Sequence, residues 1–207
     1  MRKILAPIVT PFFAYHGTTS TAAKQILDSE TFDPGDPRED HWLGQGSYFY
    51  REDPESAKTW AFFKIRQRRL RRETPTVLSA KINATERNFL NLDSRSGMER
   101  FKQHIDKFRK DGVNMTIDPG ASKKDARTRC LIMSMLPLEI SVIQRTFKVD
   151  ESTFDDVHEF REMGLHLNGT QICVRDPVVI IKDTIQQVYP TYSNLITRPA
   201  RKEPRTI

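Results

Sequence analysis

Residues 12–18, Phe-Phe-Ala-Tyr-His-Gly-Thr, form a compact aromatic run near the start of the chain. A proline precedes the run and Gly17 lies near its end, a pattern typical of a short buried strand. Either Ser20 or Thr21 can cap a helix directly after it, because apolar side chains then recur at helical spacing. The run therefore predicts a strand that leads into a helix, with the polar side chain of His16 near the junction.

A second unit of strand and helix follows. The sequence Gly-Ser-Tyr-Phe-Tyr at residues 46–50 predicts a strand, because aromatic residues follow a glycine. Asp53 then offers a capping carboxylate, and Pro54 suits the first turn of a helix. We expect this helix to run to about Arg72. Its seven positive charges are Lys58, Lys64, Arg66, Arg68, Arg69, Arg71 and Arg72.

The remaining chain alternates short strands with helices. Helices are expected over residues 96–135, with a break at 111–120, and over 150–163. Strands are expected over residues 76–83, 89–93, 141–149, 170–176 and 178–189. These strands are too short and too rich in alternating polar residues for a doubly wound parallel sheet. The sequence therefore predicts an α+β fold: a mostly antiparallel, split sheet with flanking helices and a helical insertion.

The composition limits the kind of protein this can be. Hydrophobic residues make up 37% and charged residues 29% of the 207, which is typical of a globular domain. We expect one domain over residues 1–195, with 84–165 as a divergent insertion and 196–207 as a basic, mobile tail. No apolar run approaches the roughly 18 residues of a membrane-spanning helix, so no membrane partner is expected.

Charge and cysteine usage point to the compartment and the partner. The two cysteines form no metal-ligand or disulfide pattern, which favours the reducing cytoplasm. The five histidines show no ligand spacing with cysteine or carboxylate, so no metal is expected. Lys and Arg number 33 against 27 Asp and Glu, and the net charge of +6 favours an anionic partner such as nucleic acid or a dinucleotide.

Four short segments carry the chemistry. They are His16-Gly17-Thr18, Leu43-Gly44-Gln45-Gly46-Ser47-Tyr48-Phe49, Ser56-Ala57-Lys58-Thr59-Trp60 and Gly169-Thr170-Gln171. In this order they resemble the poly(ADP-ribose)-polymerase-like branch of the ADP-ribosyltransferases, whose signature is His-Tyr-Glu. The resemblance is good over residues 15–61, fair over 168–182 and absent over 84–165. It implies an ADP-ribosyltransferase-like fold and NAD as the co-substrate.

The resemblance also implies roles for individual residues. His16 would hydrogen-bond the adenosine ribose of NAD, and the backbone of Gly17 would hold the nicotinamide carboxamide. Tyr48 would stack on the nicotinamide ring, whose cationic charge an aromatic face attracts. Further NAD contacts are expected from Thr18, Ser56 and Trp60, although Trp60 lies one residue beyond the family's usual stacking aromatic. Gly44 and Gly46 would let the backbone turn sharply and approach the cofactor.

Position 171 departs from the family. A glutamate is expected there, and Gln171 can orient the ribose but cannot act as a general base. Chain elongation needs a deprotonated hydroxyl, so the expected reaction is mono-transfer to a nucleophile that needs little activation. The catalytic set is then His16, Tyr48 and Gln171. Three carboxylates near the motif can replace the missing one: Glu39, Glu52 and Glu55.

Each of these residues also has a purely structural explanation. His16 can be a satisfied histidine at a strand end, and Tyr48 and Trp60 can be core aromatics. The arginines after the second helix can simply form a solvated face. The functional interpretation depends on the four segments occurring together and in the order of the family signature.

The positive charge suggests what the ADP-ribose is transferred to. We expect Arg66, Arg68, Arg69, Arg71 and Arg72 to bind a nucleic-acid backbone. The nearest functional resemblance is to RNA-modifying toxins of toxin–antitoxin–chaperone systems, which implies RNA bases as acceptor, a role in bacterial defence, a neutralising antitoxin and a chaperone. Two alternatives stay open: a protein-directed mono-ADP-ribosyltransferase, and an inactive module that binds NAD, ADP-ribose or nucleic acid.

Overall fold

The computed structural model describes residues 10–34, 41–113, 122–148, 158–163 and 167–191. Within these ranges seven strands form one sheet in the order β4-β5-β6-β2-β1-β3-β7. β4 and β5 are parallel, and the other neighbouring pairs are antiparallel. The α+β class and the mostly antiparallel sheet are confirmed. The strands are β1 (Phe12–Thr19), β2 (Ser47–Arg51), β3 (Pro75–Ile82), β4 (Phe89–Asn91), β5 (Val142–Lys148), β6 (Asn168–Val174) and β7 (Ile180–Tyr189).

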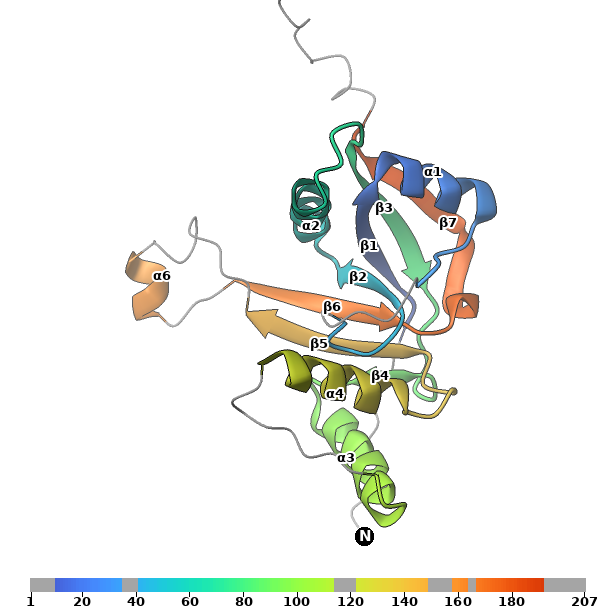
Figure 1. Ribbon diagram of the computed structural model, residues 1–207, viewed down its shortest axis with the longest axis vertical. Coiled ribbons are helices and arrows are strands. Elements are labelled where there is room, and N and C mark those ends of the chain that lie inside the picture. Colours follow the sequence, from blue (N-terminus) through green and yellow to red (C-terminus); the bar gives the residue numbers. More distant parts are fainter. Residues whose placement is uncertain (1–9, 35–40, 114–121, 149–157, 164–166, 192–207) are drawn as a thin grey trace, which may run out of the picture.

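The sheet opens between its two central strands. β1 pairs with β3 along its whole length, but it pairs with β2 only through Ala14–Arg51 and Tyr15–Tyr50. Beyond this point β2 stays paired with β6. Figure 1 shows the consequence, since β1, β3 and β7 turn steeply away from β5 and β6. The end of β1 that carries His16 therefore lies where the two halves of the sheet diverge.

Helices flank both halves of the sheet (Figure 1). Ala14 of β1 shares an apolar cluster with Ala23 of α1, whereas Gly17 contacts Ala57 of α2. Residues 14 and 17 face opposite sides of a strand, so α1 and α2 cover opposite faces. The helices are α1 (Ser20–Ser29), α2 (Pro54–Gln67), α3 (Arg95–Lys110), α4 (Ser122–Ser134) and α6 (His158–Glu162), with a 3-10 turn η1 (Pro177–Val179).

The start of α1 differs from the prediction. Thr19 is the cap, because its hydroxyl accepts the N–H of Ala22 at 3.3 Å. The predicted caps have another partner: the Ser20 hydroxyl donates to the Glu73 carboxylate at 2.7 Å, and the Thr21 N–H donates to the same oxygen at 3.0 Å.

The end of α2 also differs. Asp53 caps the helix as predicted, accepting the N–H of Ser56 at 2.9 Å. The helix ends at Gln67 instead of near Arg72, since Arg69 adopts a φ of 54° that an α-helix cannot contain. The arginines after Gln67 therefore lie in the connection to β3, where their spacing is not helical.

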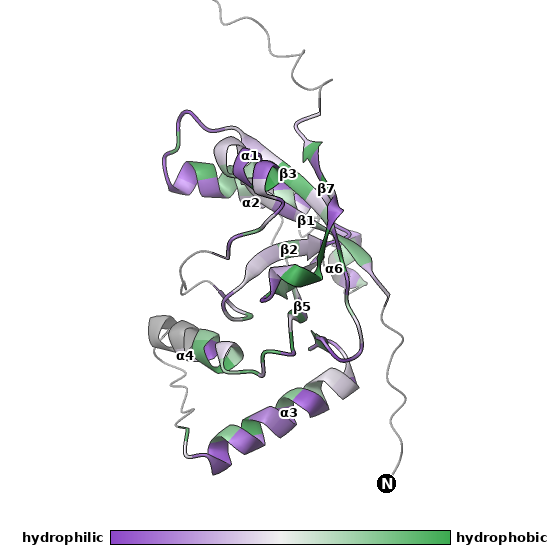
Figure 2. Cartoon of the chain, turned by 90° about the vertical axis from the view of Figure 1, so that its right-hand side faces the viewer, coloured by the Kyte–Doolittle hydropathy of each residue, from purple (hydrophilic) through white to green (hydrophobic). Residues whose placement is uncertain are grey.

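Residues 84–165 contribute β4 and β5 to the common sheet and α3 and α4 to one flank. α3 is amphipathic in Figure 2, and its Phe108 is buried beneath β4 and β5 with Leu90 and Ile143. Cys130 and Cys173 are buried free thiols. Much of the helix expected over 150–163 lies outside the described residues, with α6 covering 158–162. The tail 196–207 lies outside them entirely.

Arg175, a partly buried arginine, holds the chain between α4 and β5 in place. Its guanidinium donates to four carbonyls at and after the end of α4, and Ser134 at that end accepts the N–H of Gln45 at 3.2 Å. The loop that leads into β2 is thus held against α4. The four carbonyls bonded by Arg175 belong to Ser134, Leu136, Pro137 and Ile140, at 2.9–3.0 Å.

Candidate functional site

A cavity of about 480 Å³ lies where β1 and β2 diverge. β1, β2, α1, α2, β6 and the residues around 41–42 all contribute to its wall. Most of the residues singled out from the sequence meet here, although they come from four separate segments. They are His16, Gly17, Thr18, Gly46, Tyr48, Trp60 and Gln171. Ser56 is not part of this lining; it lies in the first turn of α2 beside the capping Asp53.

His16 is held in one orientation and one tautomer. Its Nδ1 lies 2.7 Å from the Tyr48 carbonyl oxygen, and its ring packs at 5.4 Å against both Phe32 and Phe49. A carbonyl oxygen only accepts, so Nδ1 carries the proton and donates to it. In the neutral ring Nε2 then keeps a lone pair. His16 therefore presents a hydrogen-bond acceptor, which suits a hydroxyl group of a ligand.

The surroundings of His16 keep it neutral. Burial lowers the pKa of His16 to about 4, the hydrogen bond to Tyr48 opposes this in part, and the positive charge of Lys64 lowers it further. The acceptor at Nε2 is therefore present throughout the physiological pH range.

This depressed pKa predicts a pH-dependent stability. The unfolded chain binds a proton at His16 below about pH 6.5, whereas the folded chain binds this proton only below about pH 4. Stability should therefore fall as the pH falls through this window, by roughly 3 kcal/mol at about 1.4 kcal/mol per unit. Urea unfolding of the wild type and of His16→Gln measures this loss. Between the two ends of this pH window the wild type should lose more stability than the variant, and equal losses would contradict a neutral His16 in the folded chain.

Tyr48 forms a wall of the cavity with its hydroxyl already bonded. The hydroxyl donates to the Gly44 carbonyl at 2.9 Å and accepts the N–H of Leu43 at 2.8 Å. Burial raises the pKa of Tyr48 further above its usual value, so the phenol stays protonated. Its ring stacks with that of His41 at 5.1 Å. Tyr48 can offer an aromatic surface, but not a phenolate base.

The glycines before Tyr48 have a packing explanation. Gly44 has a φ of 89°, a conformation that side-chain-bearing residues rarely adopt. A Cβ at Gly46 would lie 2.6 Å from both the Cys173 Sγ and the Val174 carbonyl oxygen. Close contact with β6 is thus sufficient to require glycine at position 46.

α2 crosses β1 at Gly17 and supplies one side of the cavity. A Cβ at Gly17 would lie 1.9 Å from the Ala57 carbonyl oxygen, so the helix backbone rests directly on the strand. Trp60 and Lys64, one turn apart, extend from α2 to the cavity. Among the described residues that line it, Lys64 is the one lysine or arginine. In the sequence, Lys64 stands out only as part of a basic run.

α1 forms another side of the cavity, which was not predicted from the sequence. Ala22, Gln25, Ile26 and Ser29 line the cavity at positions i, i+3, i+4 and i+7, which form one face of a helix. The same periodicity in the sequence could have marked this face.

Gln171 reaches the cavity from β6, where it lies opposite Tyr50 of β2 and Arg145 of β5. Burial and the charge of Asp53 raise the pKa of Tyr50, and a hydrogen bond from the Gln171 side chain opposes them. Tyr50 and Gln171 are thus neighbours on adjacent strands at the cavity wall. Tyr50, which also lines the cavity, was not singled out from the sequence.

Two of the three candidate replacement carboxylates, Glu52 and Glu55, lie away from the cavity. Glu52 pairs with Arg51 and Glu55 with Lys58, with side chains 72% and 77% exposed, and neither lines the cavity. Glu39 is outside the described residues. In the part of the wall that the structure describes, Asp33 is the one carboxylate.

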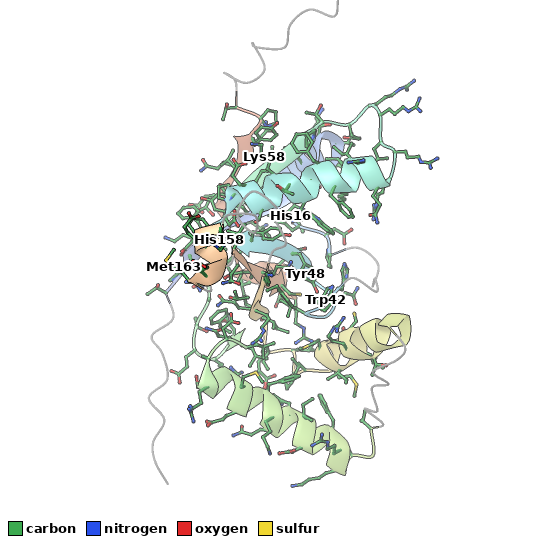
Figure 3. All side chains as sticks on the ribbon, turned by 90° about the vertical axis from the view of Figure 1, so that its left-hand side faces the viewer. His16, Trp42, Tyr48, Lys58, His158 and Met163 are labelled. Carbon is green, nitrogen blue, oxygen red and sulfur yellow. The ribbon has the colours of Figure 1, made fainter. Side chains whose placement is uncertain are left out.

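The arginine cluster, defined as Arg66, Arg68, Arg69, Arg71 and Arg72, is exposed and follows the end of α2 that carries Lys64. Figure 3 shows His16, Tyr48 and Trp42 in succession from the α2 side toward α4. The described ranges contain no group of three or more potential metal ligands. Nor does any helix within them have the length and apolarity to span a membrane.

Comparison with known proteins leaves the family open. No family model matches the chain, and no solved structure matches it significantly. An uncharacterized protein of Methanocaldococcus jannaschii is 24% identical over 184 residues, which cover 81% of this chain and 84% of the relative. The chain is thus similar to a protein of comparable extent whose description gives no activity.

Proposed function

We propose that the cavity between β1 and β2 binds NAD, and that the protein transfers ADP-ribose from NAD to nucleic acid, with RNA as the preferred acceptor. The observation that carries the proposal is the convergence of His16, Gly17, Tyr48, Trp60 and Gln171 on one cavity. The short pairing of β1 with β2 supports an ADP-ribosyltransferase-like split sheet.

The chemistry of the wall suits the parts of NAD. The lone pair on His16 Nε2 can accept a hydrogen bond from a ribose hydroxyl. The rings of Tyr48 and Trp60 offer aromatic surface to the cationic nicotinamide, an attraction of roughly 0.5–2 kcal/mol. Lys64 supplies positive charge for the pyrophosphate.

Transfer requires cleavage of the bond between the ribose carbon and the nicotinamide nitrogen. The bonding electrons leave with nicotinamide, which becomes neutral, and an oxocarbenium-like ribosyl cation develops. Positioned hydrogen-bond acceptors stabilise such a cation, and the amide oxygen of Gln171 can serve as one. An acceptor nitrogen then forms the new bond with its lone pair and releases a proton afterwards.

The lack of a glutamate at position 171 favours particular acceptors. Gln171 cannot deprotonate a hydroxyl, whereas the exocyclic amine of a base can attack before it loses its proton. The exposed arginine cluster, which follows Lys64 at the end of α2, supplies charge for a phosphate backbone. Gln171 equally favours a second candidate, an inactive module that binds NAD without cleaving it.

NAD labelled on its adenylate phosphate tests the proposal. The protein is incubated with this NAD and, in separate reactions, with RNA, single-stranded DNA and protein from a cell extract. We expect label on RNA, and loss of this labelling in His16→Ala but not in His104→Ala, a histidine variant on α3 outside the cavity lining. Label on protein alone would overturn the acceptor, and an absence of labelling in every reaction would overturn the transfer activity.

A further inference from the structure

We infer that Phe63 is a stacking platform for an unpaired base, and that it guides single-stranded nucleic acid from the arginine cluster to the cavity. The inference rests on the proposed function, because it assigns the path of the acceptor to the same cavity. Phe63 and its neighbour on α2, Phe62, face different surroundings.

Phe62 and Phe63 are equally exposed but point in different directions. Their exposed fractions are 49% and 48%, which is high for phenylalanine. The Phe62 ring lies 6.4 Å from that of Tyr189 on β7. The Phe63 ring lies 5.4 Å from that of Trp60, at an interplanar angle of 30°. Phe63 therefore belongs to the cavity side of α2, and Phe62 to the β7 side.

Helical geometry agrees with these contacts. At about 100° per residue, Phe63 lies about 60° around the helix from Trp60, whereas Phe62 lies about 160° away. Trp60 and Lys64 both line the cavity, so Phe63 is next to them on the outer side of the same face. Together Trp60 and Phe63 form an aromatic pair that extends from the cavity wall into solvent.

Positive charge continues from the aromatic pair. Arg66 is exposed one turn after Phe63, and the rest of the arginine cluster follows in the connection to β3. Aromatic surface combined with a basic stripe is how proteins bind single strands, since phosphates pair with the cations while unpaired bases stack on the rings. A base on Phe63 would lie beside Trp60, at the edge of the cavity where the proposed reaction takes place.

This arrangement favours a single strand over a duplex or a protein. A duplex keeps its bases stacked on one another, so it can use the arginines but not Phe63. Base stacking on an aromatic ring is also tolerant of sequence. The inferred acceptor is therefore single-stranded RNA or an unpaired loop, with little preference for sequence around the modified base.

Fluorescence anisotropy with a labelled single-stranded RNA of about twelve nucleotides tests this. Phe63→Ala should weaken its binding roughly 5- to 100-fold, the range expected for one lost base stack. Phe62→Ala, equal in exposure and in the atoms removed, should change binding by less than about 2-fold because its ring lies on the β7 side. Phe63→Trp keeps an aromatic ring and should bind the single strand about as tightly as the wild type does. A duplex of the same sequence should bind to the wild type and to Phe63→Ala with equal affinity.

Equal effects of Phe62→Ala and Phe63→Ala, or no binding of the single strand by the wild type, would overturn the inference. Nicotinamide release from NAD, measured on the same variants, separates this failure from that of the proposed function. If Phe63→Ala weakens RNA binding while the wild type does not cleave NAD, the proposed function fails and the single-strand platform stands. If the wild type cleaves NAD and Phe63→Ala binds RNA normally, the platform alone fails.

Discussion

Gly17→Ala should destabilise the fold by roughly 3 kcal/mol or more, a large effect for one added methyl group. The new Cβ would lie 1.9 Å from the Ala57 carbonyl oxygen and 2.8 Å from the Ala57 carbonyl carbon. Both atoms belong to the backbone of α2, so no side-chain rotation can relieve the overlap. The helix has to move away from β1, and Trp60 and Lys64 move with it. The same substitution should therefore also enlarge the cavity.

Gly112→Ala is the matched comparison. A Cβ at Gly112 meets nothing within 4 Å, although the φ of 77° is unfavourable for alanine. Its cost should be only about 1 kcal/mol, the usual penalty for this conformation. Urea unfolding gives both values. Equal destabilisation by the two substitutions would show that α2 does not press on β1 as described.

The central elements were predictable because local signals agreed with the tertiary structure. The aromatic run at 12–18 became β1, and the residues at 46–50 became most of β2. Asp53 and Pro54 marked the start of α2 correctly, since a capping carboxylate and a proline in the first turn act within a few residues. These features need no knowledge of the rest of the chain.

The errors arose where a distant residue decides between local alternatives. Ser20 and Thr21 are adequate caps by type, but the Glu73 carboxylate, far along the chain, bonds both of them. Thr19 then becomes the cap. The prediction placed the end of α2 too far along the chain because arginines favour helices. The chain instead turns at Arg69 to enter β3.

The composition of the site was only partly predictable. The resemblance of the four segments to a family signature pointed to His16, Tyr48 and Gln171, but it could not show that the sheet opens between β1 and β2. The tautomer of His16 follows from a carbonyl on another strand, so no local pattern reveals it. Lys64 and Tyr50 face the cavity because of the position of α2 and the register of β2, both of which are tertiary properties.

The second large effect concerns the proposed cleavage of NAD. Gln171→Ala should lower the rate of nicotinamide release roughly 100-fold, because it removes an acceptor positioned for the developing ribosyl cation. Gln171→Glu should retain or exceed the wild-type rate, since a carboxylate adds negative charge at the same place. Gln186→Ala, an exposed glutamine on β7 outside the cavity lining, is the control.

Nicotinamide release from NAD, with single-stranded RNA present, is the most direct measurement of the central claim. The wild type and Gln186→Ala should release nicotinamide at similar rates, and Gln171→Ala and His16→Ala should each be slower by roughly 100-fold while remaining folded. Release that is unaffected by Gln171→Ala and His16→Ala, or no release by the wild type, would contradict the claim that the cavity between β1 and β2 is a site of NAD cleavage.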